Sequence, residues 1–394
     1  MTLFAATLAL VALLGTLLVA PRMARLNRLQ PDFGASDPSG EGGPQVAVVL
    51  AARDEAPSVE PALRSLLERS APHTRVVAVD DRSTDGTTEI LARLADEHAR
   101  LTVVRVDELP AGWLGKNHAL DRGAAAAGEV EWILFTDADV VFAPGAVEAA
   151  ARYAATRELD HLTGGPSIRA RSLPLAGMVA AFGVLFGLFT QPWRAPIAGA
   201  RSAVGIGALN LVRRRTYEAA GGHRTLRMCI IDDLGLGRVM KAAGGRSEFV
   251  FAGDLAEVEW YPGVGAMMRG LVKNAYAGVD FRFAVAVAAT AFIAGLLVAP
   301  FVLPWLPGVP PEARALSAAA AGLHILAALR AAGHAGLPRA AALLFPVGLA
   351  LFLVTLWRSV LTAHLTGQVV WRGTAYPLAE LVRACEGSPW RRYR

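Results

Sequence analysis

The stretch that decides the fold class is EWILFTDADVV, residues 131–141. Its residues 132–135 form a short apolar run with strong strand preference, and the flanking segments have helix-like composition. Such a run is typical of a strand buried in a parallel sheet. Asp137 and Asp139 follow it directly. We therefore expect both carboxylates just past the carboxyl end of a strand, where open α/β sheets bind their ligands.

Asp137 and Asp139 also predict a metal site. One residue separates them, which places two hard oxygen ligands near one point. This spacing suits Mg²⁺ or Mn²⁺ carried by a diphosphate, because such ions take few protein carboxylates and share the phosphate oxygens. A D-x-D triplet alone is more often a solvated turn. Its position at the end of an apolar strand favours the metal site.

The composition is that of a membrane protein with a water-soluble part. The 394 residues are 54% hydrophobic and the mean hydropathy is +0.38, with the excess concentrated in a few runs. The net charge is +5 and the arginines cluster beside these runs. We interpret this basicity as membrane orientation and contact with anionic lipid, and we expect no nucleic-acid partner. Two cysteines, Cys229 and Cys385, form neither a disulfide framework nor a metal cluster.

The first 30 residues are predicted to be an N-terminal membrane anchor. Residues 3–20 carry no charge, and three arginines follow them: Arg22, Arg25 and Arg28. A cleaved signal peptide would have its positive charges before the apolar stretch. The positive charges after it predict that the following domain lies in the cytoplasm. Residues 31–45, rich in Gly, Ser, Pro and Asp, are predicted to be a linker.

From residue 46 the sequence alternates between strand and helix patterns. We expect strands at residues 46–50, 76–79, 101–106 and 132–136, with helices at 58–69, 87–98 and 119–127 between them. Ser58 is a suitable N-cap for the first of these helices. Alternating elements of these lengths predict a parallel sheet with helices on both faces.

Several later segments are apolar enough to meet the membrane. Residues 174–190 are uncharged but lie inside the predicted catalytic region, so we favour an interfacial helix or hairpin over a span. Residues 284–303 and 340–357 have the length of membrane spans. The status of 316–329 stays open, and with it the side on which the C-terminus lies. Residues 284–360 thus hold two or three predicted transmembrane helices, and residues 361–394 form a basic tail.

Four acidic sites lie at predicted strand ends or in loops. They are Asp54-Glu55, Asp80-Asp81, Asp137/Asp139 and Asp232-Asp233. Any one of them could be a capping or solvated pair. Their common placement, where a parallel sheet presents its ligands, indicates a binding site.

These motifs resemble the family 2 glycosyltransferases, which are inverting enzymes with a GT-A fold. The resemblance rests on AARDE at 51–55, VDDRSTDGT at 79–87, the D-A-D triplet and IIDD at 230–233. Further segments resemble the membrane branch associated with hopanoid and carotenoid glycosylation: GWLGKNHAL at 112–120, GLVKNAYAG at 270–278 and VVWRGTAYP at 369–377. The resemblance implies a Rossmann-like, mostly parallel sheet with helices on both faces over residues 46–283.

The resemblance also implies a role for each acid. Glu55 and Asp81 are expected to hold the nucleotide base and ribose of the donor. Asp137 is expected to frame the sugar and, with Asp139 as the likelier direct ligand, to bind the metal. Asp233 is expected to be the general base. Lys116 is a candidate for the diphosphate, although a solvated lysine at a helix start explains the sequence equally well.

The chemistry of an inverting transfer needs two separate acidic clusters. The acceptor hydroxyl attacks the anomeric carbon from the face opposite the leaving diphosphate, so a base is required on one side. A divalent cation is required on the other side to absorb the leaving group's charge. The resemblance thus implies a nucleotide-sugar donor of the UDP type and Mg²⁺ or Mn²⁺.

Three departures from the family pattern occur, and the third affects the predicted product. The usual Arg-Asn-Glu is Arg53-Asp54-Glu55 here and the usual Glu-Asp is Asp232-Asp233, and both keep the assigned acid. No Gln-x-x-Arg-Trp motif of the processive polysaccharide synthases follows Asp233. We therefore expect transfer of a single sugar to a lipid-like acceptor at the membrane. A multi-pass protein of the inner membrane with a cytoplasmic catalytic domain is expected.

Other functions remain as alternatives. One is a polysaccharide or cell-envelope glycan synthase of the same family. Another is a nucleotidyltransferase, which would normally show a Gly-rich phosphate loop, whereas residues 51–56 contain no glycine. A membrane scaffold with a decayed transferase domain predicts loss of an acidic cluster, and all four are present. Cys229, four residues before Asp233, is interpreted as a packed apolar residue.

Overall fold

The computed structural model describes residues 2–31, 43–388 and 393, and it divides into two compact units. One unit consists of Met1–Leu26, Arg169–Gln191 and Trp260–Ala379. The other consists of Asn27–Ile168, Pro192–Glu259 and Glu380–Arg394. We call them the helical unit and the sheet unit. Most of the predicted linker, residues 32–42, lies outside the described residues.

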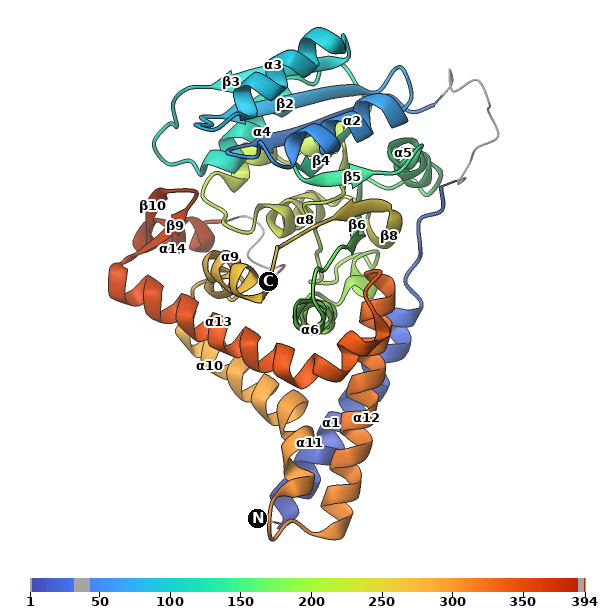
Figure 1. Ribbon diagram of the computed structural model, residues 1–394, viewed down its shortest axis with the longest axis vertical. Coiled ribbons are helices and arrows are strands. Elements are labelled where there is room, and N and C mark those ends of the chain that lie inside the picture. The colour runs from blue at the N-terminus through green and yellow to red at the C-terminus, as the bar shows by residue number, and fades with distance from the viewer. Residues whose placement is uncertain (1, 32–42, 389–392, 394) are drawn as a thin grey trace. The chain divides into compact units, whose positions relative to one another are not determined.

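The sheet unit contains an eight-stranded mixed sheet (Figure 1). Its strand order is β3-β2-β1-β4-β7-β6-β8-β5. The strands are β1 (Val46–Ala52), β2 (Arg75–Asp81), β3 (Leu101–Val106), β4 (Trp132–Asp137), β5 (Val140–Phe142), β6 (His161–Ile168), β7 (Asn210–Arg213) and β8 (Ser247–Val258). The four predicted strands are β1 to β4, and they pair in parallel. The antiparallel strands β5 and β7 make the sheet mostly rather than wholly parallel.

The register of the parallel strands brings three of the four predicted acidic sites to one edge of the sheet. Ala51 of β1 pairs with Asp137 of β4, and Ala52 of β1 pairs with Asp80 of β2. The carboxyl ends of β1, β2 and β4 therefore lie side by side. This placement is the one predicted from the sequence, and it follows from the short apolar runs that precede each acid.

Amphipathic helices cover the sheet. They are α2 (Val59–Arg69), α3 (Thr87–Glu97), α4 (Gly115–Ala126), α5 (Ala146–Thr156), α7 (Arg214–Ala219) and α8 (Asp232–Ala242). Helix α2 buries residues 59, 62, 63 and 66, a spacing that forms one apolar face. Apolar side chains of α4 and α8, among them Leu120 and Leu236, share a core with strand residues such as Val49. Helix α4 begins four residues before its predicted start, so Lys116 is helical.

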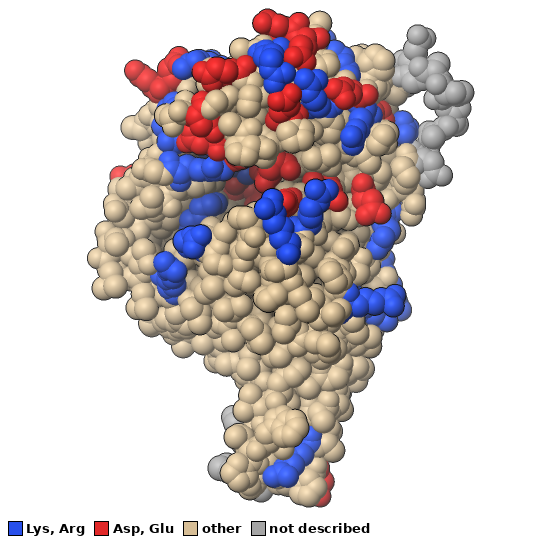
Figure 2. Space-filling model, viewed as in Figure 1, with Lys and Arg blue, Asp and Glu red and all other residues tan. Residues whose placement is uncertain are grey.

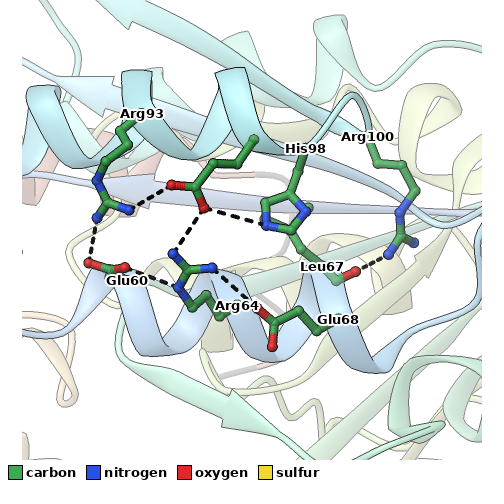
Figure 3. A network of polar contacts seen from close by, with 8 residues as sticks. Glu60, Arg64, Leu67, Glu68, Arg93, His98 and Arg100 are labelled. Carbon is green, nitrogen blue, oxygen red and sulfur yellow. Dashed lines mark hydrogen bonds and ion pairs between the residues drawn. The ribbon is translucent and has the colours of Figure 1, made fainter.

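Helices α2 and α3 are joined on their outer side by ion pairs (Figure 3). Glu60 accepts hydrogen bonds from Arg64 at 3.0 Å and Arg93 at 2.7 Å, and Glu97 accepts from the same two arginines. Hydrogen bonds from Arg93 and Arg64 lower the pKa of Glu60. These side chains are one-third or more exposed, so solvent screens the pairs. The network aligns two helices and lies apart from the acidic edge of the sheet.

The helical unit is built from long apolar helices and a small hairpin. Its elements are α1 (Thr2–Ala24), α6 (Leu173–Thr190), α9 (Val264–Ala277), α10 (Phe283–Phe292), α11 (Ala299–Val302), α12 (Pro311–His334), α13 (Phe345–Thr366), β9 (Gln368–Trp371) and β10 (Thr374–Pro377). Helix α1 lies beside α12 (Figure 1). Figure 2 shows almost no charge over the surface of α10 and α13, whereas charges of both signs cover α2 and α3.

Within the part of the chain that the structure describes, four helical segments are long and apolar enough to cross a membrane. They are Leu173–Arg194, Phe283–Trp305, Pro311–His334 and Arg339–Thr366. The third includes residues 316–329, whose status the sequence leaves open. Helix α6, predicted to be interfacial, packs closely on α13: a Cβ on Gly348 would lie 2.8 Å from the Cβ of Ala181. Length and composition do not distinguish a span from an interfacial helix, so that assignment stays a prediction.

Candidate active site

The centre of the acidic edge is the turn after β4. Asp137 ends β4, and Asp139 lies in the tight turn before β5. Burial raises the pKa of Asp139 to about 7, and the charges of Asp137 and Glu55 add to this effect. The structure thus brings Glu55 from the end of β1 within electrostatic range of the D-x-D pair. Such crowding of negative charge disfavours ionisation unless a cation is present.

Lys116, in the first turn of α4, joins two of the acidic sites. Its Nζ lies 2.7 Å from Oδ1 of Asp137 and 2.9 Å from Oδ2 of Asp232. Burial would lower the pKa of Lys116, but the charges of Asp137, Asp232 and Asp233 outweigh it and raise the pKa well above its ordinary value. Lys116 is therefore a fixed positive charge within the cluster, not the solvated lysine of the alternative interpretation.

Asp232 and Asp233 occupy the first turn of α8. The carboxylate of Asp233 accepts hydrogen bonds from the backbone N–H groups of Leu234 at 2.7 Å and Gly207 at 3.2 Å. Burial and the neighbouring charge of Asp232 raise the pKa of Asp233 to about 6, whereas Lys116 opposes the shift. An aspartate held in this way can be ionised at neutral pH and still accept a proton readily.

The loop of residues 205–210 shapes the site, and sequence reasoning missed it. Asp137 donates its backbone N–H to the carbonyl oxygen of Gly207 at 2.9 Å. A Cβ on Gly207 would lie 2.3 Å from Oδ2 of Asp137, and one on Gly205 would lie 1.8 Å from the carbonyl oxygen of Asp233. Only glycine lets this backbone pass between the two acids. The signal available in the sequence was the pair of glycines in GIG, residues 205–207.

Asn210, the last residue of this loop, links His161 to the backbone of Asp233. Asn210 donates from Nδ2 to the carbonyl oxygen of Asp233 at 3.2 Å, and its Oδ1 lies 2.7 Å from Nε2 of His161. Burial lowers the pKa of His161 to about 4. The imidazole is therefore neutral, and it donates from Nε2 to the amide oxygen. This buried contact fixes which end of the Asn210 amide faces Asp233.

Asp81 is held at the edge of the same region by arginine side chains. Arg82 donates to both of its carboxylate oxygens, at 2.8 and 3.1 Å, and Nη1 of Arg53 lies 4.0 Å away. A Cβ on Gly115 would lie 2.4 Å from Oδ2 of Asp81. Asp81 thus lies against Gly115 at the start of α4. Gly115 directly precedes Lys116 in the chain.

The first acidic loop is tied to the second by short polar side chains. Asp54 Oδ1 accepts from the backbone N–H of Thr84 at 2.7 Å, and the N–H of Glu55 donates to Thr87 Oγ1 at 2.9 Å. The hydroxyl of Ser58 donates to the Glu55 carboxylate at 2.9 Å. The prediction that the Ser58 side chain caps α2 is therefore wrong. The hydroxyl of Ser58 binds the Glu55 carboxylate and not the helix start. The residues that follow Asp81 in the sequence, 82–87, mainly form hydrogen bonds that hold the two loops together.

Asp80 and Cys229 have structural surroundings. Asp80 is 2% exposed and accepts from Ser83 N–H at 3.1 Å and Thr88 Oγ1 at 2.6 Å, which closes the turn after β2. Cys229 belongs to the core that includes Leu226 and Leu236, and burial raises the pKa of its thiol. The interpretation of Cys229 as a packed residue agrees with this environment.

The D-x-D pair has the donor set of a cation shared with a substrate. No group of three or more His, Cys, Asp or Glu side chains suited to a metal occurs among residues 2–31, 43–388 and 393. Asp137 and Asp139 supply two carboxylates, and burial together with the charges of Asp137 and Glu55 raises the pKa of Asp139. These residues therefore fit Mg²⁺ or Mn²⁺ whose remaining ligands come from phosphate and water.

Comparison with known proteins agrees with this geometry. Residues 47–174 match the model of the family "Glycosyl transferase family 2". The chain is 28% identical over 194 residues to 4,4'-diaponeurosporenoate glycosyltransferase from Staphylococcus aureus, in strains USA300 and NCTC 8325 among others. This match covers 49% of the chain and 50% of the relative. The chain thus spans about half the length of the curated relatives it matches.

A solved structure shares the fold. A mannosyltransferase from Pyrobaculum calidifontis, determined in complex with GDP-Man and Mn2+, aligns with a TM-score of 0.54 and 22% sequence identity. The alignment covers 92% of this chain and 98% of that one. This likeness shows that the chain shares the GT-A fold, and the match to Glycosyl transferase family 2 lies within the sheet unit and the start of α6.

Proposed function

We propose that this chain is an inverting glycosyltransferase that moves one sugar from a nucleotide-sugar donor to a lipid acceptor at the membrane. The observation that carries the proposal is the position of Lys116 between Asp137 and Asp232. This contact brings the end of β4 and the start of α8 into one polar cluster. The cluster supplies both a place for a diphosphate and a separate base, which is the division of roles that inversion needs.

The donor would be held by residues from two strand ends and from the start of α4. Glu55 and Asp81 are proposed to hold the base and ribose, because their carboxylates lie at the ends of β1 and β2. Lys116 is proposed to pair with the diphosphate. Its ammonium group is fixed by two carboxylates, so it needs little reorganisation to accept a phosphate oxygen as a further partner.

Asp137 and Asp139 would hold Mg²⁺ or Mn²⁺ with the donor diphosphate. When bound, the cation would absorb negative charge on the departing diphosphate. Asp137 keeps its contact with Lys116 and frames the sugar. The mannosyltransferase from Pyrobaculum calidifontis was solved with GDP-Man and Mn2+, which supports the choice of donor class and cation.

Asp233 is the proposed general base. Its Oδ1 and Oδ2 are oriented by the N–H groups of Leu234 and Gly207, and these bonds leave further lone pairs on both oxygens. One of them would take the proton of the acceptor hydroxyl, or of a carboxylic acid, as that oxygen attacks the anomeric carbon. Lys116 stabilises the ionised form of Asp233 before the proton moves.

A lipid acceptor and a membrane location complete the proposal. The matched relative is named for diaponeurosporenoate, and four helical segments among the described residues are suited to a bilayer. We propose a multi-pass protein of the inner membrane with its catalytic domain in the cytoplasm. The domain scheme retained in this proposal is an anchor at 1–30, a catalytic region at 46–283 and spans within 284–360.

Product analysis tests the proposal. Membranes containing the protein are incubated with labelled nucleotide-sugars and Mg²⁺ or Mn²⁺, and the products are extracted into organic solvent. We expect label in a monoglycosylated lipid, and no such label from membranes containing the Asp233→Asn variant. Label in a long polymer would instead support a glycan synthase, and release of pyrophosphate from a nucleoside triphosphate would support a nucleotidyltransferase.

A further inference from the structure

The helical unit carries an open apolar groove between α10 and α13. Its volume is about 620 Å³. One face of α13 supplies most of its wall, through side chains at helical spacing: Val354, Arg358, Leu361 and Leu365. Three of these are large apolar groups exposed by 55% or more. Apolar side chains exposed to this degree need to be covered by lipid or by another apolar surface. Arg358, which lies among them, also needs a partner of opposite charge.

The opposite wall is fixed by α10. The indole N–H of Trp357 donates to Oγ1 of Thr290 at 3.0 Å, and this hydroxyl donates to the carbonyl oxygen of Ala286 at 2.8 Å. The Trp357 ring also meets Phe283 edge to face, with ring centroids 5.9 Å apart. These contacts fix the position of α13 relative to α10. The groove is therefore a preformed feature and not a loose gap between two apolar surfaces.

Arg358 is the charged group of this groove. It is exposed, and no hydrogen bond or ion pair of its side chain occurs within the described part of the chain, residues 2–31, 43–388 and 393. It nevertheless lies inside Arg339–Thr366, a segment suited to crossing a membrane. An arginine at membrane depth is costly unless it pairs with a counter-ion or extends to the interface. Thr362, one turn further along α13, adds a hydroxyl to the same groove.

We propose that this groove binds one anionic phospholipid of the surrounding bilayer. Its phosphate would pair with the guanidinium of Arg358, which can donate two hydrogen bonds to phosphate oxygens. One acyl chain would lie along Val354 and Leu353, towards the middle of the segment. The charge of Arg358 favours an anionic over a zwitterionic headgroup, as basic pockets between membrane helices generally do. The groove does not depend on the proposed transferase function, since none of its residues belongs to the acidic cluster.

Fluorescence quenching by brominated lipid tests the proposal, because Trp357 lines the groove. The full-length protein is placed in phosphatidylcholine nanodiscs that contain either brominated phosphatidylglycerol or brominated phosphatidylcholine. The signal of Trp357 is obtained by subtracting the emission of a Trp357→Phe variant. We expect the anionic lipid to quench Trp357 at about fivefold lower mole fraction than the zwitterionic lipid.

Two substitutions of Arg358 test whether its guanidinium causes the lipid preference. Arg358→Gln is expected to abolish the fivefold preference, and Arg358→Lys to retain part of it. Arg339→Gln is the matched control, because Arg339 is also exposed in the same candidate span but does not line the groove. Equal quenching by the two lipids in the wild-type protein, or an unchanged preference in Arg358→Gln, would overturn the proposal.

The same assay recognises other occupants. If a brominated long-chain carboxylic acid quenches Trp357 and brominated phosphatidylglycerol does not, the groove takes an acid-ended acceptor and the proposal is wrong. If no brominated lipid reaches Trp357 and the protein is a dimer in nanodiscs, a second copy covers the groove, which also overturns it. Neither result bears on nucleotide-sugar turnover, so failure here is distinguishable from failure of the proposed function.

Discussion

The ammonium nitrogen of Lys116 lies 2.7 Å from Oδ1 of Asp137, although one residue starts a helix and the other ends a strand. A second contact, 2.9 Å to Asp232, extends this link to the start of α8. A partly buried charge with such partners is costly to remove, because the acids left behind repel each other. Lys116 therefore stabilises the acidic cluster, and in the proposed function it would also supply the positive charge that a diphosphate requires.

Replacing Lys116 by methionine tests its proposed role in donor binding. The variant keeps a similar length but loses the charge, and a charged hydrogen bond is worth about 1.5–3 kcal/mol. We expect the KM for the nucleotide-sugar to rise about 10- to 100-fold, measured with saturating acceptor. Lys241→Met is the control, because Lys241 donates to the backbone carbonyl oxygens of Ala195 and Ile197. It should lower stability and leave the donor KM unchanged.

The two acids at the start of α8 can be separated by single amide substitutions. Asp233→Asn cannot accept the acceptor's proton, so turnover should fall by about 10²- to 10⁴-fold while nucleotide binding is largely kept. Asp232→Asn removes an ion pair with Lys116 and should cost less turnover. Turnover and nucleotide binding are measured on the same preparations. A larger loss of turnover in Asp232→Asn would show that the base is Asp232.

The pH dependence of turnover follows from the pKa of Asp233, which burial raises to about 6. The base must be ionised to accept a proton, so activity is lost as the pH falls through this value. We expect kcat/KM to be constant above pH 7 and to fall about tenfold per unit well below pH 6. The measurement is a profile from pH 5 to 8 with saturating metal. A profile that stays flat down to pH 5 would contradict this assignment.

Metal dependence is tested at Asp139. Asp139→Ala removes one proposed ligand without disturbing β4, which ends at Asp137. We expect transfer to be abolished while the protein stays folded and membrane-bound, as judged by its thermal transition and its sedimentation with membranes. Wild-type activity should also be lost in excess EDTA and return with Mg²⁺ or Mn²⁺. Full activity in excess EDTA would exclude the proposed metal role.

Gly207→Ala tests the loop that separates the two acids. The new Cβ would lie 2.3 Å from Oδ2 of Asp137, so either the loop or the carboxylate must move. A displacement of about 1 Å in such a site can cost about 10²-fold in rate. Gly43→Ala is the matched control in the same unit, because its Cβ would meet the His73 ring at an ordinary 3.7 Å. Equal activity of the two variants would show that the loop adapts.

The sequence predicted the first half of the sheet well because its strands are short apolar runs. β4 was expected at 132–136 and is observed at Trp132–Asp137. β6 and β7 were not predicted. His161–Ile168 contains two glycines and a proline, and Asn210–Arg213 has only four residues. Such segments become strands through pairing with neighbours that are distant in the chain, which periodicity does not reveal.

The acids of the site were recognisable in the sequence, but their supports were not. Asp137 and Asp233 stand out because carboxylates are rare beside apolar runs. Gly207 and Asn210 act through their backbone or through one amide, and their importance depends on which segments the fold brings together. Lys116 was equally consistent with a solvated position. Only the contact with Asp137 and Asp232 distinguishes the two interpretations.

Membrane topology gives the last prediction, because nucleotide-sugars are cytoplasmic. In a variant with Cys385→Ser, the remaining Cys229 is buried, so added cysteines can be labelled selectively. Glu129→Cys, at a side chain that is 98% exposed in the sheet unit, should react with a membrane-impermeant thiol reagent only after the cells are permeabilised. Trp305→Cys, 84% exposed at the end of the segment Phe283–Trp305, should react in intact cells if that segment spans. Rapid labelling of residue 129 in intact cells would reverse the orientation and remove the domain from its donor.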